Sequence, residues 1–226
     1  MSNRSTNNLT IVLIISIITS LLFGISSYVF VLTLSASYII FVVGILLFVL
    51  AIPIHFLGKK GARTVPYCMS ICFTTIGSGL SAAGYYLYRK EALTVSEVLV
   101  GVLICIITNV ILHLLFSWVP NKGACKLIGG SLLAVLVILF VYLWNNAGSA
   151  YNSYLFFTTI LATFTYLVYL ITAGTDRPVY RDISFGSFGI FLVITTVVLI
   201  ILSDGDALEF LDVFDTPGTR RKHNRG

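Results

Sequence analysis

Seven long apolar segments follow one another along the chain, and no Asp, Glu, Lys or Arg lies in the middle of any of them. A helix of about 20 mostly apolar residues crosses the roughly 30 Å hydrocarbon core of a bilayer. In hydrocarbon each segment must satisfy its own backbone hydrogen bonds, which favours helices over open strands. We therefore expect an all-α integral membrane protein, a bundle of seven transmembrane helices.

Composition and length support one membrane domain. Only 10% of the 226 residues are charged, whereas soluble domains carry about 25%. We expect an N-terminal tail (1–8), a seven-helix domain (9–204), and a short amphipathic segment with a disordered basic tail (205–226). The expected helices cover about 9–30, 34–57, 66–88, 95–119, 125–145, 151–173 and 184–203.

The Lys and Arg residues of the connections predict an orientation. Most of them fall on the side of the N-terminus, whereas the other side holds Arg89 and Lys90. Because short cytoplasmic loops are enriched in Lys and Arg, we expect a cytoplasmic N-terminus and an outside C-terminus in the cell membrane. The basic residues of the C-terminal tail lie at the edge of the distance from the membrane over which this rule applies. Including them reduces the difference between the two sides in the number of Lys and Arg residues.

The net charge of +5 is explained by residues that flank membrane segments. The partner of these charges is then the lipid bilayer and not nucleic acid. The four cysteines include no CxxC pair, and His55 and His113 with scattered cysteines do not form a metal site. We expect no metal and no cofactor.

Small and polar residues of the third segment recur at alternating spacings of three and four. They are Tyr67, Ser70, Thr74, Gly77, Ser81, Gly84 and Tyr88. That spacing places them on one face of a helix. Membrane helices pair closely through small residues and hydroxyls, so Gly77 and Gly84 are candidates for helix packing. The same face could instead line a cavity, with Thr74 and Ser81 as ligand-binding residues.

The run 74–79, Thr-Thr-Ile-Gly-Ser-Gly, resembles part of a potassium-channel selectivity filter, in which backbone carbonyls replace the hydration shell of the ion. A filter follows a short pore helix and is extended. This run sits instead in the middle of an uninterrupted helical pattern, and Ser78 stands where an aromatic residue is customary. An ion channel is therefore a remote alternative.

The fourth and sixth segments carry the remaining polar residues at depth. Asn109 and His113 are four residues apart and share a helical face. An ionisable group inside a membrane is by default a functional hypothesis, although we favour the simpler explanation of a neutral histidine that is hydrogen-bonded to a neighbouring helix. On the sixth segment, Thr158 and Thr165 belong to a seven-residue repeat, with Tyr169 nearby. We expect that face to meet protein or a polar cavity.

Most membrane chemistry requires residues that these segments lack. The expected helices contain no buried Asp or Glu for a proton or sodium relay, and no acid, base and nucleophile that could act together. We identify no catalytic residue, and an intramembrane enzyme is the least supported class.

Two functional classes stay open. The first is a transporter- or receptor-like protein that binds a small neutral or lipophilic ligand among Asn109, His113 and the faces of the third and sixth segments, without ion-coupled pumping. The second is an assembly subunit or homo-oligomer that uses the small-residue faces to contact a membrane-protein partner. The sequence favours the first slightly.

Overall fold

The structure is a computed structural model. It describes residues 3–33, 37–61, 64–88, 94–119, 122–146, 150–172 and 178–188. All regular structure in these ranges is α-helix. The six full helices are α1 (Asn3–Thr33), α2 (Ser37–Gly61), α3 (Thr64–Tyr88), α4 (Val95–Trp118), α5 (Lys122–Asn146) and α6 (Ala150–Thr172). A seventh helical stretch covers 179–188, which we call the 179–188 helix.

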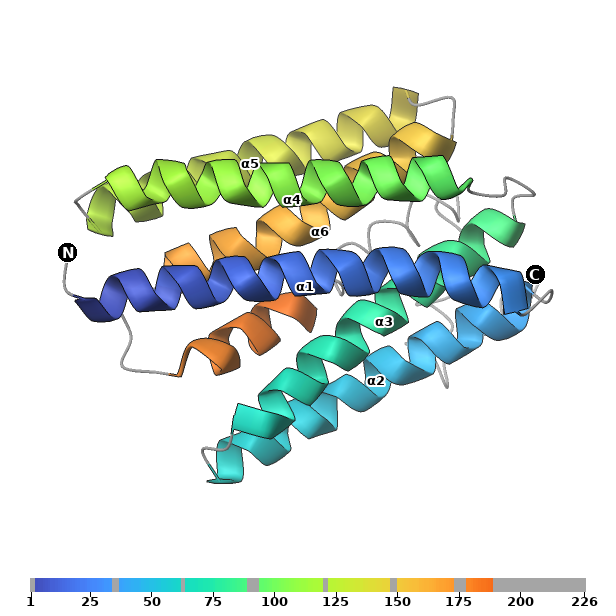
Figure 1. The fold of residues 1–226 in the computed structure, drawn as a ribbon, viewed down its shortest axis with the longest axis horizontal. Helices are drawn as coiled ribbons and strands as arrows, with labels where there is room; N and C mark the ends of the chain where they lie inside the picture. Colours follow the sequence, from blue (N-terminus) through green and yellow to red (C-terminus); the bar gives the residue numbers. More distant parts are fainter. Residues whose placement is uncertain are drawn as a thin grey trace, which may run out of the picture. The chain divides into compact units, whose positions relative to one another are not determined.

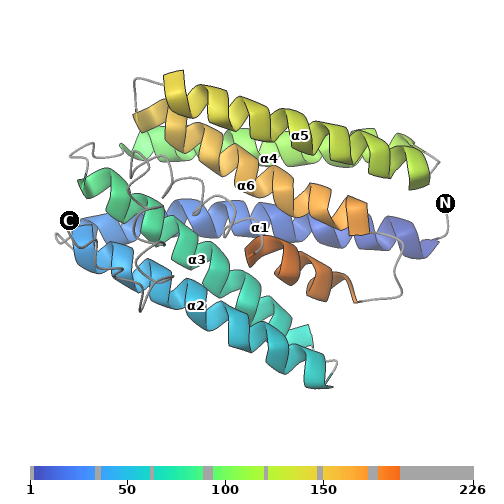
Figure 2. The same cartoon turned by 180° about the vertical axis from the view of Figure 1, so that it is seen from behind.

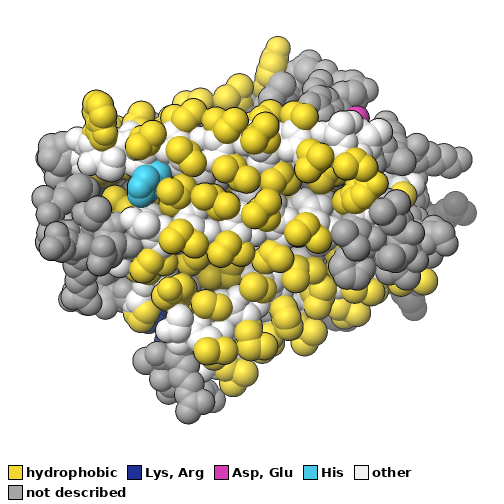
Figure 3. Space-filling model, in the orientation of Figure 1, with side chains coloured by type: hydrophobic (Ala, Val, Ile, Leu, Met, Phe, Trp, Pro, Cys, Tyr) yellow, Lys and Arg dark blue, Asp and Glu magenta, His cyan; other side chains and the backbone are white. Residues whose placement is uncertain are grey.

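Three of these helices are long and apolar enough to cross a membrane. Within the described ranges the candidate spans are Asn8–Tyr28, Ile39–Lys59 and Val95–Trp118, and shorter apolar helices cover Gly123–Leu136 and Thr158–Tyr169. Hydrophobic side chains cover the described part of the face in Figure 3, with few charges between them. The chain is therefore an integral membrane protein that contacts the lipid bilayer.

The helices extend beyond the expected spans. Residues 31–33, expected as a connection, are the last turn of α1, and α2 continues past Lys59 to Gly61. A helix can project beyond the hydrocarbon because a lysine side chain reaches the polar layer. The 179–188 helix begins before the expected start at 184. The rest of that expected span and the segment 205–226 lie outside the described residues.

Local sequence sets one helix start with a capping box. The Thr94 hydroxyl accepts a bond from Glu97 N (3.4 Å), and the Glu97 carboxylate accepts one from Thr94 N (2.7 Å). These bonds satisfy two backbone groups that the first turn of α4 leaves open.

The N-terminal helix is the centre of the packing in residues 1–190. Helix α1 contacts α3, α4 and α6, whereas α2 packs on α3 and α5 packs on α6. Figures 1 and 2 show α1 between the α2–α3 pair and the α4–α6 group from both sides. Buried apolar residues of α1, α3, α4, α5, α6 and the 179–188 helix form one core cluster.

Candidate functional site

The small-residue face of α3 meets α2. A Cβ atom at Gly77 would lie 2.7 Å from the Gly44 carbonyl oxygen, and one at Gly84 would lie 2.7 Å from the Phe41 nitrogen. From the other side, a Cβ atom at Gly44 would meet the Ser81 hydroxyl and the Ser81 nitrogen. The two backbones approach this closely because none of these three glycines carries a side chain.

The hydroxyls of the same face bond to backbone. Ser70 donates across the interface to the Ala51 carbonyl oxygen of α2 (2.8 Å). Thr74 donates to the Ser70 carbonyl oxygen and Ser81 to the Gly77 carbonyl oxygen, each at 2.8 Å. These buried hydroxyls are therefore satisfied by the hairpin of α2 and α3 itself.

The filter-like run 74–79 is part of the continuous helix α3. Its two glycines contact two different helices. A Cβ atom at Gly79 would collide with Ser26 of α1 and would lie 2.9 Å from the Phe23 carbonyl oxygen of the same helix. Gly77 faces α2 instead. In the structure this run packs α3 between two helices.

Asn109 lies deep in the bundle and is only half satisfied. Its side chain has no exposed surface, and its amide nitrogen donates to the Cys105 carbonyl oxygen (2.8 Å) one turn earlier. Its Oδ1 atom has no hydrogen-bond partner in the described part of the chain. Leaving a buried acceptor unpaired costs about 1–3 kcal/mol.

The second buried polar side-chain atom without a partner, among the described residues, is the hydroxyl oxygen of Ser16 on α1. Ser16 is also fully buried. Sequence reasoning passed over it because a lone serine in an apolar helix usually bonds to its own backbone, as Thr19 and Ser20 do here by donating to the Ser16 carbonyl oxygen.

Ser16 and Asn109 lie at the same level of two antiparallel helices. At one end, a Cβ atom at Gly24 of α1 would collide with Val102 of α4. At the other end, Leu9 belongs to the same core cluster as Leu112. At about 1.5 Å per residue, Ser16 lies about 12 Å from Gly24 along α1, and Asn109 about 10 Å from Val102 along α4. The two side chains therefore lie at a similar depth in the bundle.

Helix α6 completes this junction, because it contacts both α1 and α4. The Cys105 thiol of α4 bonds to Thr158 and Thr159 of α6. Thr165 donates to the Leu161 carbonyl oxygen of its own helix (3.0 Å). The threonine face, which was predicted to meet protein or a polar cavity, is buried at Thr158 and Thr165.

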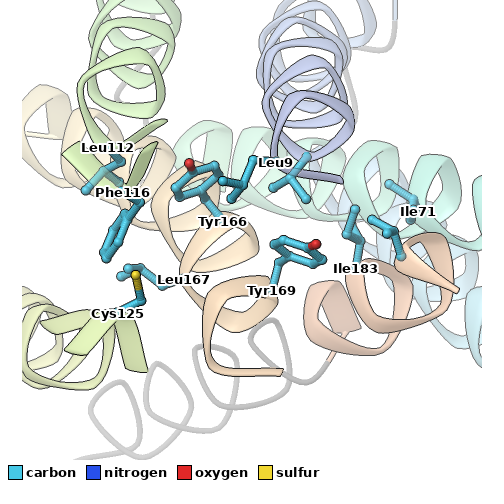
Figure 4. Packing of buried hydrophobic residues seen from close by; sticks show 11 residues of the cluster. Leu9, Ile71, Leu112, Phe116, Cys125, Tyr166, Leu167, Tyr169 and Ile183 are labelled. Atoms are coloured by element: carbon cyan, nitrogen blue, oxygen red, sulfur yellow. The ribbon is translucent and has the colours of Figure 1, made fainter. Parts of the chain in front are cut away.

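Two tyrosines of α6 lie nearer one end of the bundle. The Tyr166 hydroxyl is 3.5 Å from Nδ1 of His113, at the long limit of a hydrogen bond. Tyr169 bonds to Asn8 of α1 and lies near the Asp182 carboxylate. Figure 4 shows Leu9 with the rings of Tyr166 and Tyr169 in this part of the core.

A second polar contact joins residues far apart in the sequence. His55 of α2 is 3% exposed, and its Nδ1 atom lies 2.8 Å from the Ser184 hydroxyl of the 179–188 helix. The rings of Tyr67 and Phe188 meet the imidazole edge to face, with centroids 5.2 and 5.1 Å away. This contact attaches the 179–188 helix to the α2–α3 hairpin.

The start of the 179–188 helix corrects one expectation. We expected no buried carboxylate, yet Asp182 is 9% exposed. It lies at the first turn of this helix, where its own backbone nitrogen bonds to the Pro178 carbonyl oxygen (3.4 Å). The residue was missed because it precedes the expected seventh span, in a connection that looked exposed.

The structure brings together only part of the predicted ligand site. Asn109, Thr158, Thr165, His113 and Tyr169 gather around the α1–α4–α6 junction. Thr74 and Ser81 belong to the α2–α3 contact, on the other side of α1. The candidate functional site is therefore this junction, whose helices carry the two buried unpaired atoms, Ser16 Oγ on α1 and Asn109 Oδ1 on α4.

The candidate site can be compared with metal centres and with known proteins. The described ranges contain no group of three His, Cys, Asp or Glu side chains that could hold a metal ion. Comparisons with protein-family models, with curated proteins and with solved structures found no match to this chain. The assignment of function therefore rests on the chemistry of the junction.

Proposed function

We propose that the chain is a seven-helix membrane protein that binds a neutral or lipophilic ligand in its helix bundle, as a transporter or receptor does, without ion-coupled pumping. Helices α3, α5 and α6 have 25, 25 and 23 residues, which is long enough to cross a bilayer. Helix α3 packs on the candidate spans α1 and α2, α6 packs on the candidate spans α1 and α4, and α5 packs on α6. The 179–188 helix supplies the start of the seventh.

The observation that supports ligand binding is the pair of buried polar atoms without partners, Ser16 Oγ and Asn109 Oδ1. The polar side chains of the junction carry an amide, hydroxyls, a thiol and the imidazole of His113. No Asp, Glu, Lys or Arg is among them, and an ion buried in a low dielectric without an opposite charge is very costly. We therefore take the ligand to be an uncharged molecule.

Photolabelling tests this function directly. The purified full-length protein in lipid nanodiscs is labelled with a diazirine-bearing long-chain alcohol, and the labelled residues are mapped by mass spectrometry. We expect saturable labelling on the inner faces of α1, α4 and α6. Unlabelled decanol should compete, whereas decanoate and decylammonium should not.

The variant Asn109→Leu should lose most of this labelling, whereas Ile111→Ala, at an exposed position of the same helix, should keep it. Labelling confined to exposed positions such as Ile111 and Leu114, with no saturation, would rule out a ligand site in the bundle.

The alternative function is an assembly subunit that uses the faces of the third and sixth segments as docking faces. In the structure α2 fills the face of α3 at Gly77 and Gly84. That face is therefore not free for a partner helix or a second copy, and the alternative depends on the face of α6.

We also propose a cell-membrane location with a cytoplasmic N-terminus. Supporting it, the positive charges of Lys59 and Arg181 both act on His55, so these two basic residues lie at the same end of the bundle. The positive-inside rule assigns such an end to the cytoplasm.

A further inference from the structure

The contact between His55 and Ser184 holds an ionisable group at a helix interface. Nδ1 of the imidazole lies 2.8 Å from the Ser184 hydroxyl, and both side chains are buried. A neutral imidazole can accept from this hydroxyl at Nδ1, whereas a protonated ring carries a hydrogen on both nitrogens and can only donate. The serine oxygen can accept in turn, so a proton on His55 reverses the bond without breaking it. The groups around the ring therefore decide what the proton does.

Aromatic rings from three helices enclose the imidazole. The ring centroids of Tyr67 and Phe188 are 5.2 and 5.1 Å away, and those of Phe56 and Phe185 are 5.5 and 6.1 Å away. They take the place of the water that would solvate the positive charge of a protonated ring. A cation over an aromatic face gains some energy, but the cost of removing an ion from water is larger. The enclosure therefore favours the neutral imidazole.

The charged groups around His55 favour the neutral ring as well. Lys59, one turn later on α2, and Arg181 of the 179–188 helix both act on the imidazole, and both are positive. Helices α2 and α3 contain no Asp or Glu, and α3 presents the phenol of Tyr67. The acidic residue of the 179–188 helix, Asp182, acts on a tyrosine of α6. Among the described residues, a proton on His55 would add a third positive charge without an opposite charge beside it.

We propose that His55 and Ser184 form a pH-sensitive latch, which holds the 179–188 helix against the α2–α3 hairpin while the imidazole is neutral and releases it when the imidazole takes up a proton. The latch lies at the end of the bundle that we assign to the cytoplasm, so it senses cytoplasmic protons. It does not depend on the proposed ligand, because neither residue belongs to the α1–α4–α6 junction.

The latch should weaken in acid. An imidazole exposed by release has a pKa of about 6.5. The released state therefore takes up a proton as the pH falls below this value, whereas the closed contact excludes it. The contact loses stability with falling pH wherever the released state binds more protons. For one proton, the ratio of released to closed molecules should rise about tenfold between about pH 7.5 and about pH 5.5.

Hydrogen exchange tests the latch in the full-length protein in nanodiscs, with mass spectrometry at these two pH values and correction for the intrinsic pH dependence of amide exchange. In the wild type, we expect the protection of peptides from 179–188 to be about tenfold lower at the lower pH. In His55→Gln, which takes up no proton at this position, protection should be the same at both. The matched control is His113→Gln, which removes the other histidine of the described helices and should keep the tenfold difference.

Two further measurements separate the charge from the hydrogen bond. Ser184→Ala should lower protection at both pH values and keep the tenfold difference, because the imidazole and its basic neighbours remain. If His55→Gln does not fold, ¹⁵N NMR of the wild-type imidazole replaces it. The ring nitrogen signals distinguish the neutral from the protonated form, and they should change over the pH range in which protection falls.

Protection of 179–188 that is independent of pH in the folded wild type would overturn the proposal. So would a rise in protection on acidification, because it would show that the protonated ring holds Ser184 more tightly than the neutral ring. A fall that persists in His55→Gln would also overturn it and would assign the titration to another group, such as Asp182.

Discussion

Single buried residues decide how this helix bundle is joined, and the contact between His55 and Ser184 is the clearest case. The two residues are 129 positions apart, and neither carries a local signal that names the other. A histidine near a helix end suggests an interfacial position, and a serine at a helix start suggests a cap. Only the folded chain brings them together, because sequence periodicity indicates a face and not its partner.

Removing one member of this contact should destabilise the protein. In Ser184→Ala, the buried His55 Nδ1 atom loses its 2.8 Å partner, which should lower the free energy of unfolding by about 1–3 kcal/mol. The control is Ser187→Ala, because Ser187 is also buried but donates to the Ile183 carbonyl oxygen of its own helix (2.7 Å). Reversible unfolding in mixed micelles measures both, and equal losses would contradict the cross-helix role.

At the scale of helices, the sequence predicted more of the structure than it did at the scale of single residues. The apolar segments predicted the helices, and the spacing of three and four predicted which face of α3 packs closely. It did not predict that α2 would be the neighbour, or that Gly79 would serve α1. Thr74 and Ser81 were assigned to a ligand site because a polar stripe that packs and one that lines a cavity have the same spacing.

A methyl group should be enough to separate α2 from α3. In Gly77→Ala the new Cβ atom would lie 2.7 Å from the Gly44 carbonyl oxygen, and such overpacking costs about 1–3 kcal/mol. The matched control is Gly130→Ala on α5, where no atom lies within 4 Å of the new Cβ. There the gain in helix propensity should leave stability unchanged or higher.

The same unfolding measurement compares the two glycine variants. A stable Gly77→Ala protein would mean that the helices are not as close as described. The result also bears on the assembly alternative, because a face already filled by α2 should leave the oligomeric state of the variant unchanged in size-exclusion chromatography.

For the molecule as a whole, the placement of basic residues yields a topology prediction. In a cysteine-free background, Lys59→Cys should react with a membrane-impermeant maleimide only from the cytoplasmic side, and Ser96→Cys only from outside. Both positions are exposed, at the end of α2 and the start of α4. Labelling of intact and opened cells measures this, and the reversed pattern would invert the orientation.

The central place of α1 has a consequence for how the chain is made. Helix α1 precedes all three of its neighbours, α3, α4 and α6, in the chain, so it is synthesised before any of them. Until these neighbours are made, the serines and threonines of α1 are exposed to hydrocarbon. Four of them are compatible with this exposure, because each donates a hydrogen bond to a carbonyl oxygen of the preceding turn: Thr19, Ser20, Ser26 and Ser27. The Ser16 hydroxyl has no such bond in the described part of the chain, so contact of α1 with hydrocarbon before its neighbours are made costs more at Ser16 than at these four residues.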